Sequence, residues 1–295
     1  MTWRIKIADE DTLPLIQQFL LRYNYTTATH SVSPTLAWIQ WLWQRGVILL
    51  LVKKNEGRSQ LIGCIGLLPI ECLDETRVQP CLFAVRSSHR GSGWGSLLIS
   101  AASQMTTSVW QGILTPLSLH RLFLSPICPR WAASLDLAGV SAPTPTGITL
   151  RTARSGDAEC ILQALRAQWR VREDRSVEDM PRLDHQYYCH YLRSRTAVSG
   201  TYVIGELGHV TDMCCVSYLT VLDKSSGEEK EVAVLQYYYA TSIGLGHLVD
   251  SLVYYLYLSG ITGLVFPETL YYQSITLPGT VLQELIPMGD YWMLC

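Results

Sequence analysis

The 295-residue sequence has little charge and no long apolar run. Charged residues make up 16% of it, and 23 Lys and Arg against 25 Asp and Glu give a formal net charge of -2. It contains no basic block of the kind that nucleic-acid binding requires, so we expect no nucleic-acid partner. The longest unbroken apolar run, 46–52, is far shorter than the ~20 residues that span a bilayer. We therefore expect no transmembrane segment.

The cysteines lack the spacing of a disulfide or zinc framework. Nine of them, an odd number, are scattered through the chain without a CxxC pair. His185 and Cys189 lie four residues apart, but helical periodicity alone explains that spacing and no fuller ligand set accompanies it. The opening MTWRIK has no apolar signal segment. The sequence therefore predicts a cytoplasmic protein with reduced thiols and no metal.

The chain repeats its own opening. Residues 3–21 and 148–166 each contain a short alternating strand, a polar turn with Asp, and apolar residues at helical spacing. The segment 139–147, GVSAPTPTG, has the composition of a linker. We expect a duplication with two domains, 1–140 and 148–295. Four identities share one offset of 145 residues: Ala8 and Ala153, Ile16 and Ile161, Gln18 and Gln163, Leu20 and Leu165.

Strand and helix patterns alternate in both halves. The first half predicts strands over 47–53, 61–68 and 78–85 and a helix over 94–106. This order indicates a mixed α/β fold in each half. The second half predicts helices over 158–170, 177–195 and 245–259, and strands over 201–207, 210–219, 232–241 and 263–266.

Residues 82–99, LFAVRSSHRGSGWGSLLI, carry the most informative pattern. A β-run leads into a loop with three glycines and then into an amphipathic helix. Glycines let successive N–H groups point outward at a helix N-terminus, and Arg90 adds a cation, which suits a pyrophosphate such as that of coenzyme A. The GK[ST] ending of a Walker loop is missing, and no acidic ribose partner is evident. The same pattern also occurs in a tight strand–helix connection that binds no ligand, with glycines present only for the turn.

VRSSHRGSGWGSLLI resembles the pyrophosphate-binding motif of the GNAT acyltransferase superfamily. Longer stretches resemble N-myristoyltransferases: MTWRIKIADEDTLPLIQQFLLRYNY with SPTLAWIQW, LIGCIGLLPIECLD, GITLRTARSGDAECILQALR, and VTDMCCVSY with Val210, Thr211 and Asp212. Their order and spacing hold over about 3–295. The resemblance implies an α/β fold with mixed sheets, built as two tandem GNAT-like halves with pseudo-twofold symmetry. It implies acyl-CoA in the first half and the acceptor peptide mainly in the second.

The resemblance also implies roles for individual residues. The amides of Leu82 and Phe83 would polarise the thioester carbonyl, an effect worth several kcal/mol at a developing oxyanion. Thr115 falls on a threonine that helps to hold the attacking amine. The family uses its terminal carboxylate as base, so the Cys295 carboxylate is a candidate, although the apolar tail 280–295 could instead complete a sheet. Contacts to acyl-CoA are implied for Leu82, Phe83, Ala84, Val85, Arg90, Gly91, Gly93, Trp94 and Gly95.

The sequence departs from the family at two further places. Cys81 stands where the family has an asparagine, and the acidic peptide-recognition loop reads TTATH over 26–30. The implied reaction is transfer of a myristoyl group from myristoyl-CoA to an N-terminal glycine by a monomer, with acyl-CoA as co-substrate and no other cofactor. Two alternatives stay open: a GNAT-type N-acetyltransferase acting on a small amine, and a non-catalytic relative that binds acyl-CoA or peptide.

Overall fold

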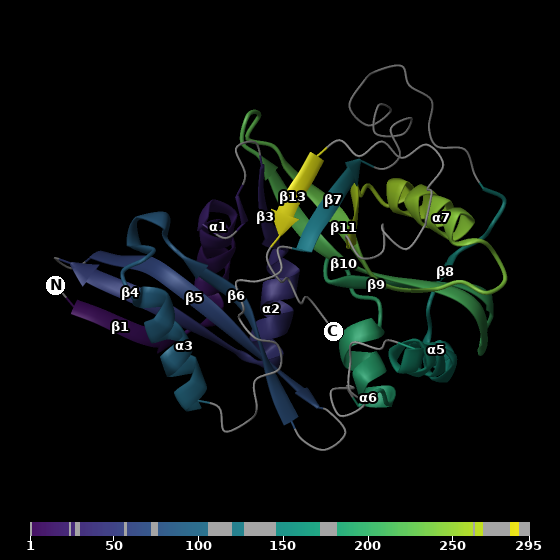
Figure 1. Ribbon diagram of the computed structural model, residues 1–295, viewed down its shortest axis with the longest axis horizontal. Coiled ribbons are helices and arrows are strands. Elements are labelled where there is room, and N and C mark those ends of the chain that lie inside the picture. Colours follow the sequence, from purple (N-terminus) through teal and green to yellow (C-terminus); the bar gives the residue numbers. More distant parts are fainter. Residues whose placement is uncertain are drawn as a thin grey trace. The chain divides into compact units, whose positions relative to one another are not determined.

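The protein has a mixed α/β fold, shown as a computed structural model in Figure 1. The structure describes residues 2–23, 25–26, 30–55, 58–71, 76–105, 120–126, 146–171, 182–261, 263–267 and 284–288. These residues divide into two compact units. Unit 1 contains residues 2–105 and the segment Thr220–Glu229, and unit 2 contains the rest. The sheets are mainly antiparallel, which confirms the expected fold class.

Unit 1 is built on a four-stranded antiparallel sheet with the order β1-β4-β5-β6. Its strands are β1 (Thr2–Ile7), β4 (Val47–Asn55), β5 (Arg58–Glu71) and β6 (Thr76–Val85). Helix α3 (Trp94–Met105) lies along this sheet (Figure 1). It buries Leu98 and Ala102 against an apolar cluster from β4, β5 and β6.

A second helix covers the opposite face of β5. Unit 1 also contains α1 (Leu13–Tyr23), the short strands β2 (Tyr25–Thr26) and β3 (His30–Pro34), and α2 (Leu36–Arg45). A Cβ on Gly63 would lie 2.8 Å from Leu98 of α3, and one on Gly66 would lie 2.8 Å from Leu42 of α2. Residues 63 and 66 point to opposite faces of a strand. The two helices therefore sandwich β5 closely.

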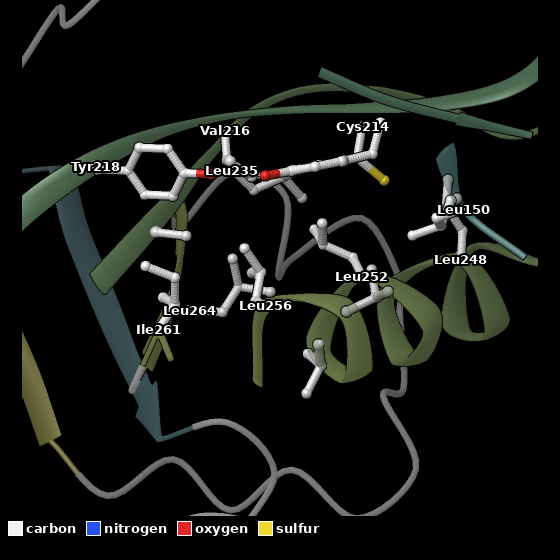
Figure 2. Close-up of a cluster of buried hydrophobic side chains, with 14 residues drawn as sticks. Leu150, Cys214, Val216, Tyr218, Leu235, Leu248, Leu252, Leu256, Ile261 and Leu264 are labelled. Carbon is white, nitrogen blue, oxygen red and sulfur yellow. Dashed lines mark hydrogen bonds between the residues drawn. The ribbon is translucent and has the colours of Figure 1, made fainter. Parts of the chain in front are cut away.

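Unit 2 packs α7 (Leu245–Leu258) against a larger sheet. Strands β11 (Glu229–Tyr239) and β12 (Gly263–Pro267) are parallel, and α7 connects them in the chain. Figure 2 shows Leu248, Leu252 and Leu256 of α7 turned toward Cys214 and Val216 of the sheet. The other strands are β7 (His120–Pro126), β8 (Arg151–Thr152), β9 (Ser199–Glu206), β10 (His209–Asp223) and β13 (Glu284–Met288).

The helix expected over 177–195 is wrong as a continuous element. Only the short helix α6 (His185–Tyr187) and a π-helical turn (Tyr188–Leu192) lie in its described part. Asp184 has extended backbone angles, and its carboxylate accepts a hydrogen bond from the Tyr187 amide at 2.9 Å. An aspartate in this role starts a helix, so the helix begins after Asp184. The other long helix of unit 2, α5, spans Ala158–Val171.

The repeated opening has the same local structure in both copies. A single 3-10 turn precedes each helix, at Glu10–Thr12 and at Ser155–Asp157, and α1 and α5 begin directly after these turns. All of these boundaries share the 145-residue offset that the identities show. The Ala8 amide donates to the Ile48 carbonyl at 2.8 Å, and the Ala153 amide donates to the Thr201 carbonyl at 2.8 Å. The sequence repeat is therefore a repeat of structure.

The two copies differ in how the turn is capped. In the first, the Asp9 amide donates to the Thr12 hydroxyl at 3.1 Å. In the second, the Arg154 amide donates to the Asp157 carboxylate at 2.8 Å. Asp157 is fully buried and also forms a two-pronged ion pair with Arg151, at 2.6 and 2.8 Å. The acceptor for the amide that precedes the turn is therefore a hydroxyl in the first copy and a buried carboxylate in the second.

Candidate functional site

A β-bulge interrupts the pairing of β5 and β6 at the start of the predicted motif. Cys64 pairs with Ala84 and Gly66 pairs with Cys81, so the residue between them on β5 faces both Leu82 and Phe83. Leu82 is buried and has a φ of 53°, in the left-handed region that a leucine rarely adopts. Bulges of this kind redirect backbone groups out of a sheet and are frequent beside active sites. The structure thus places a strained residue at Leu82, where the sequence predicts thioester contacts.

The thiol of Cys64 spans this bulge. Its sulfur donates a hydrogen bond to the Leu82 carbonyl at 3.2 Å. Burial raises the pKa of the Cys64 thiol to about 12, so the proton that it donates stays in place at physiological pH. Sequence analysis missed Cys64 because it lies in an apolar run on the neighbouring strand. Only the register of β5 against β6 reveals its position.

Cys81 precedes the bulge, at the position where the resembled family has an asparagine. Burial raises its pKa, and the nearby Cys64 raises it further, so this residue is a neutral thiol. A neutral thiol is a weak hydrogen-bond donor and a weak acceptor. Cys81 can therefore replace only part of the hydrogen bonding of an amide.

The glycine loop leaves β6 and opens to solvent. The Arg86 amide donates to the Ile62 carbonyl at 2.8 Å, and a 3-10 turn, Ser87–His89, then follows. Gly91 and Gly93 have φ values of 75° and 81°, and no atom lies within 4 Å of a Cβ built at either. Both positions need glycine for their backbone conformation. The exposed loop leads directly to the N-terminus of α3, where the first amides have no partner within the helix.

Gly95 has a different role from the other two glycines. A Cβ at this position would lie 3.1 Å from Cζ of Phe83. The Phe83 ring therefore packs on the first turn of α3 and fixes the helix start against the bulge. The sequence predicts a ligand contact at Gly95, and the structure adds a packing requirement.

Arg90 holds the loop through two backbone carbonyls. Its Nε donates to the Val85 carbonyl at 3.0 Å, and its Nη2 donates to the Tyr23 carbonyl at the end of α1. A guanidinium has five N–H donors, so three are not used by these bonds. A second cation, which sequence analysis missed, lies nearby: the Arg86 guanidinium is 5.1 Å from the centroid of the Tyr23 ring. The base of the loop therefore has two arginines.

The predicted residues of the motif thus lie at the bulge, in the glycine loop and at the start of α3. Ala84 and Val85 are buried in β6, next to the bulge. Thr115 and Cys295 lie outside the described residues. Within the described ranges, no three His, Cys, Asp or Glu side chains come together to form a metal site. The helices of the same ranges include none that is long and apolar enough to cross a membrane.

Asp212, the last residue of the VTD stretch, anchors a loop in unit 2. Its buried carboxylate accepts hydrogen bonds from the amides of Thr241 at 2.7 Å, Ser242 at 3.0 Å and Ile243 at 3.3 Å. The hydroxyls of Thr211 and Ser242 also donate to it. Burial alone would raise the pKa of Asp212, but these hydrogen bonds lower it below its ordinary value. Asp212 therefore fixes the approach to α7.

A bulged strand, a glycine loop and a helix N-terminus thus follow one another in the chain. Residues 15–115 match the model of the acetyltransferase (GNAT) family. No curated protein sequence matches the chain. The family match covers about a third of the chain.

Solved structures of N-myristoyltransferase from Saccharomyces cerevisiae have a similar fold. One, with bound myristoyl-CoA, has a TM-score of 0.64 at 12% identity, over 90% of this chain and 76% of that one. Another has a TM-score of 0.67 at 12% identity, over 90% and 72%. A third, with myristoyl-CoA and inhibitors, has a TM-score of 0.65 at 12% identity, over 89% and 73%. At this identity the likeness shows a GNAT-like fold. Together with the family match, it supports an acyltransferase of the GNAT type.

Proposed function

We propose that the chain is an N-acyltransferase that moves the acyl group of an acyl-CoA directly to an amine. The observation that carries this proposal is the bulge at Leu82 and Phe83, placed immediately before the glycine loop. The pyrophosphate binds the amides from Gly91 to Gly95 beside Arg90, and the thioester carbonyl binds at the amides of Leu82 and Phe83. Amides that are fixed in advance stabilise the oxyanion as the amine attacks.

The acyl group that we propose is myristoyl, and the acceptor is an N-terminal glycine. The resemblance of the motifs and the fold shared with yeast N-myristoyltransferase support this choice. An N-terminal amine has a pKa near ~8, so a modest base suffices to free it at neutral pH. The amine nitrogen bonds to the acyl carbon, the C–S bond breaks, and CoA leaves as the thiol with the proton that the amine gives up. Thr115 and the Cys295 carboxylate stay predictions for holding the amine and for the base. The reaction fits the cytoplasmic location that the sequence predicts.

An assay of CoA release with the purified full chain tests the reaction. Myristoyl-CoA and a peptide that starts with glycine should release CoA and yield the acylated peptide, identified by mass. A matched peptide whose N-terminal amine is blocked should not react. Release no faster than the protein-free blank, across a broad set of glycine peptides, would refute catalysis. Tight acyl-CoA binding without turnover would instead favour the non-catalytic alternative. The presence of Cys81 in place of the family's asparagine also supports that alternative.

Acyl-chain length separates the two enzymatic candidates. The match of residues 15–115 to the acetyltransferase family favours a short acyl group as the second candidate. A myristoyl chain buries about a dozen methylenes at ~0.8 kcal/mol each when a cavity fits it. Myristoyl-CoA should therefore bind far more tightly than acetyl-CoA. Equal affinities would remove the myristoyl proposal and leave an N-acetyltransferase.

A further inference from the structure

Two tryptophans form a stacked pair beside the glycine loop. Trp94 is the first residue of α3 and directly follows Gly93, whereas Trp3 comes from the edge strand β1. Their ring centroids lie 3.9 Å apart, with 26° between the ring planes. Both rings border the apolar cluster under α3, and both are partly exposed. The pair therefore presents aromatic surface to solvent where the loop ends.

Cationic and polar groups surround this aromatic surface. Lys53 is the cross-strand partner of Trp3, so the two side chains share one face of the sheet. The Lys53 ammonium lies 5.3 Å from the centroid of the Trp3 ring. The His89 ring, from the 3-10 turn of the loop, meets Trp3 edge-on with a centroid distance of 5.8 Å. Residues distant in the sequence thus gather around one indole.

This combination of groups matches the nucleotide end of CoA. Indole rings bind nucleobases by stacking, and an ammonium binds a phosphate. Beyond its pyrophosphate, CoA continues into an adenosine that bears a 3′-phosphate. Because Trp94 adjoins Gly93 in the chain, a base attached to a pyrophosphate on the loop lies close to the indole.

We propose that Trp3, Trp94 and Lys53 form the site that recognises the adenine and the 3′-phosphate of CoA. The proposal rests on the proposed function, because it assumes that the glycine loop holds the pyrophosphate. Adenine stacks on the face of Trp94 that is turned away from Trp3. Within the described part of the chain, Trp3 is the one aromatic ring in contact with Trp94. The Lys53 ammonium pairs with the 3′-phosphate.

The test of the stacking uses ligands that separate the two ends of CoA. Calorimetry measures the binding of CoA, of dephospho-CoA and of 3′,5′-ADP, which is the nucleotide end alone. Trp94→Leu keeps an apolar side chain over the core but removes the π-face, and it should weaken CoA and 3′,5′-ADP by about five- to a hundredfold. Trp94→Phe keeps a ring and should stay within a few-fold of the wild type.

The test of the phosphate contact uses a pair of neighbouring lysines. Lys53→Gln should reduce the preference for CoA over dephospho-CoA by about tenfold. Lys54→Gln makes the same change of charge one residue further along β4, on the opposite face, and should leave the preference unchanged. The two lysine variants test the proposed site even if Trp94→Leu does not fold.

Two results would overturn the proposal, and they have different meanings. If folded Trp94→Leu binds CoA as the wild type does, and Lys53→Gln behaves like Lys54→Gln, the pair only covers the core. Acyl transfer by the wild type would then be unaffected, and the proposed function would stand. If the wild type binds neither CoA nor acyl-CoA, the proposed function is refuted, and so is the proposed adenine site.

Discussion

The Cys64 thiol donates a hydrogen bond to the Leu82 carbonyl at 3.2 Å, across the bulge between β5 and β6. Leu82 has a left-handed φ of 53°, which costs a residue with a side chain about 1–2 kcal/mol. A buried hydrogen bond contributes about 1 kcal/mol. A thiol is a weak donor, so Cys64 offsets only part of the strain, and its bond to the Leu82 carbonyl holds the peptide plane that carries the Phe83 amide.

Removal of this thiol should impair catalysis more than binding. We expect Cys64→Ala to lower kcat of the proposed acyl transfer by about 10- to 100-fold, because the oxyanion donors lose their fixed geometry. The glycine loop stays intact, so the Kd for acyl-CoA should remain within about twofold. Steady-state kinetics and calorimetry measure the two quantities.

Two further variants isolate the hydrogen bond from the lost volume. Cys64→Ser keeps a donor and should recover most of kcat. Cys214→Ala removes an equally buried thiol from unit 2 and should leave kcat unchanged. A kcat for Cys64→Ala equal to that of Cys214→Ala would refute a positioning role for Cys64.

Gly93 and Gly227 offer a matched pair for the loop. Both have left-handed φ values, 81° and 73°, with no atom within 4 Å of a built Cβ, but Gly227 lies in the β10–β11 turn. Alanine at either position should cost a similar ~1–2 kcal/mol of stability. We expect only Gly93→Ala to weaken CoA, by about tenfold, because its methyl stands where phosphate meets backbone. Equal CoA affinities in the two variants would argue against the loop as the pyrophosphate site.

Arg90 should not be replaceable by lysine. Its guanidinium donates hydrogen bonds to the Val85 and Tyr23 carbonyls from two different nitrogens. The single ammonium nitrogen of lysine does not reproduce this planar arrangement of donors. We expect Arg90→Ala and Arg90→Lys to lower the thermal midpoint similarly and to weaken CoA by about tenfold or more. Arg58→Ala, a change at the exposed first residue of β5, serves as the control. Full recovery of both properties by Arg90→Lys would show that only the charge matters.

Asp157 should make the stability of unit 2 fall in acid. Its hydrogen bonds with Arg151, helped by the Arg154 and Gly208 amides, hold its pKa far below the ordinary 3.8, although burial opposes this. A lowered folded-state pKa stabilises the fold above pH ~4 and loses that contribution as the pH falls further. Asp157→Asn should cost about 3 kcal/mol at pH 7, since it removes the negative charge that pairs with the Arg151 guanidinium, and much less at pH 2.5.

Urea unfolding at several pH values measures this dependence. Exposed Asp11→Asn removes the same charge from the opening turn of unit 1 and should change neither the stability nor its slope with pH. A constant gap between the wild type and Asp157→Asn from pH 7 to pH 2.5 would contradict the assignment.

Local patterns predicted most of the elements but not the register between them. The run Leu97-Leu98-Ile99 after the glycine loop predicts α3, which begins at Trp94 as expected. Nothing in LIGCIGLL distinguishes Cys64 from its apolar neighbours, because its role arises only where β5 pairs with the bulged β6. Likewise, the Trp3–Trp94 pair joins an edge strand to a helix start. Thr115 and Cys295 stay predictions.

The sandwich around β5 also bears on how distant relatives of this chain can be found. Gly63 and Gly66 each have a helix side chain 2.8 Å from where a Cβ would be, and Cys64 between them bonds to the bulge. A larger residue at either glycine must displace a leucine side chain of the helix and also crowds β6, at the Ala84 carbonyl or the Cys81 sulfur, whereas loop residues such as Ser92 lie exposed. The tetrapeptide Gly-Cys-Ile-Gly at 63–66 should therefore tolerate fewer substitutions than the exposed positions of the glycine loop. A profile search should give these four positions the greater weight.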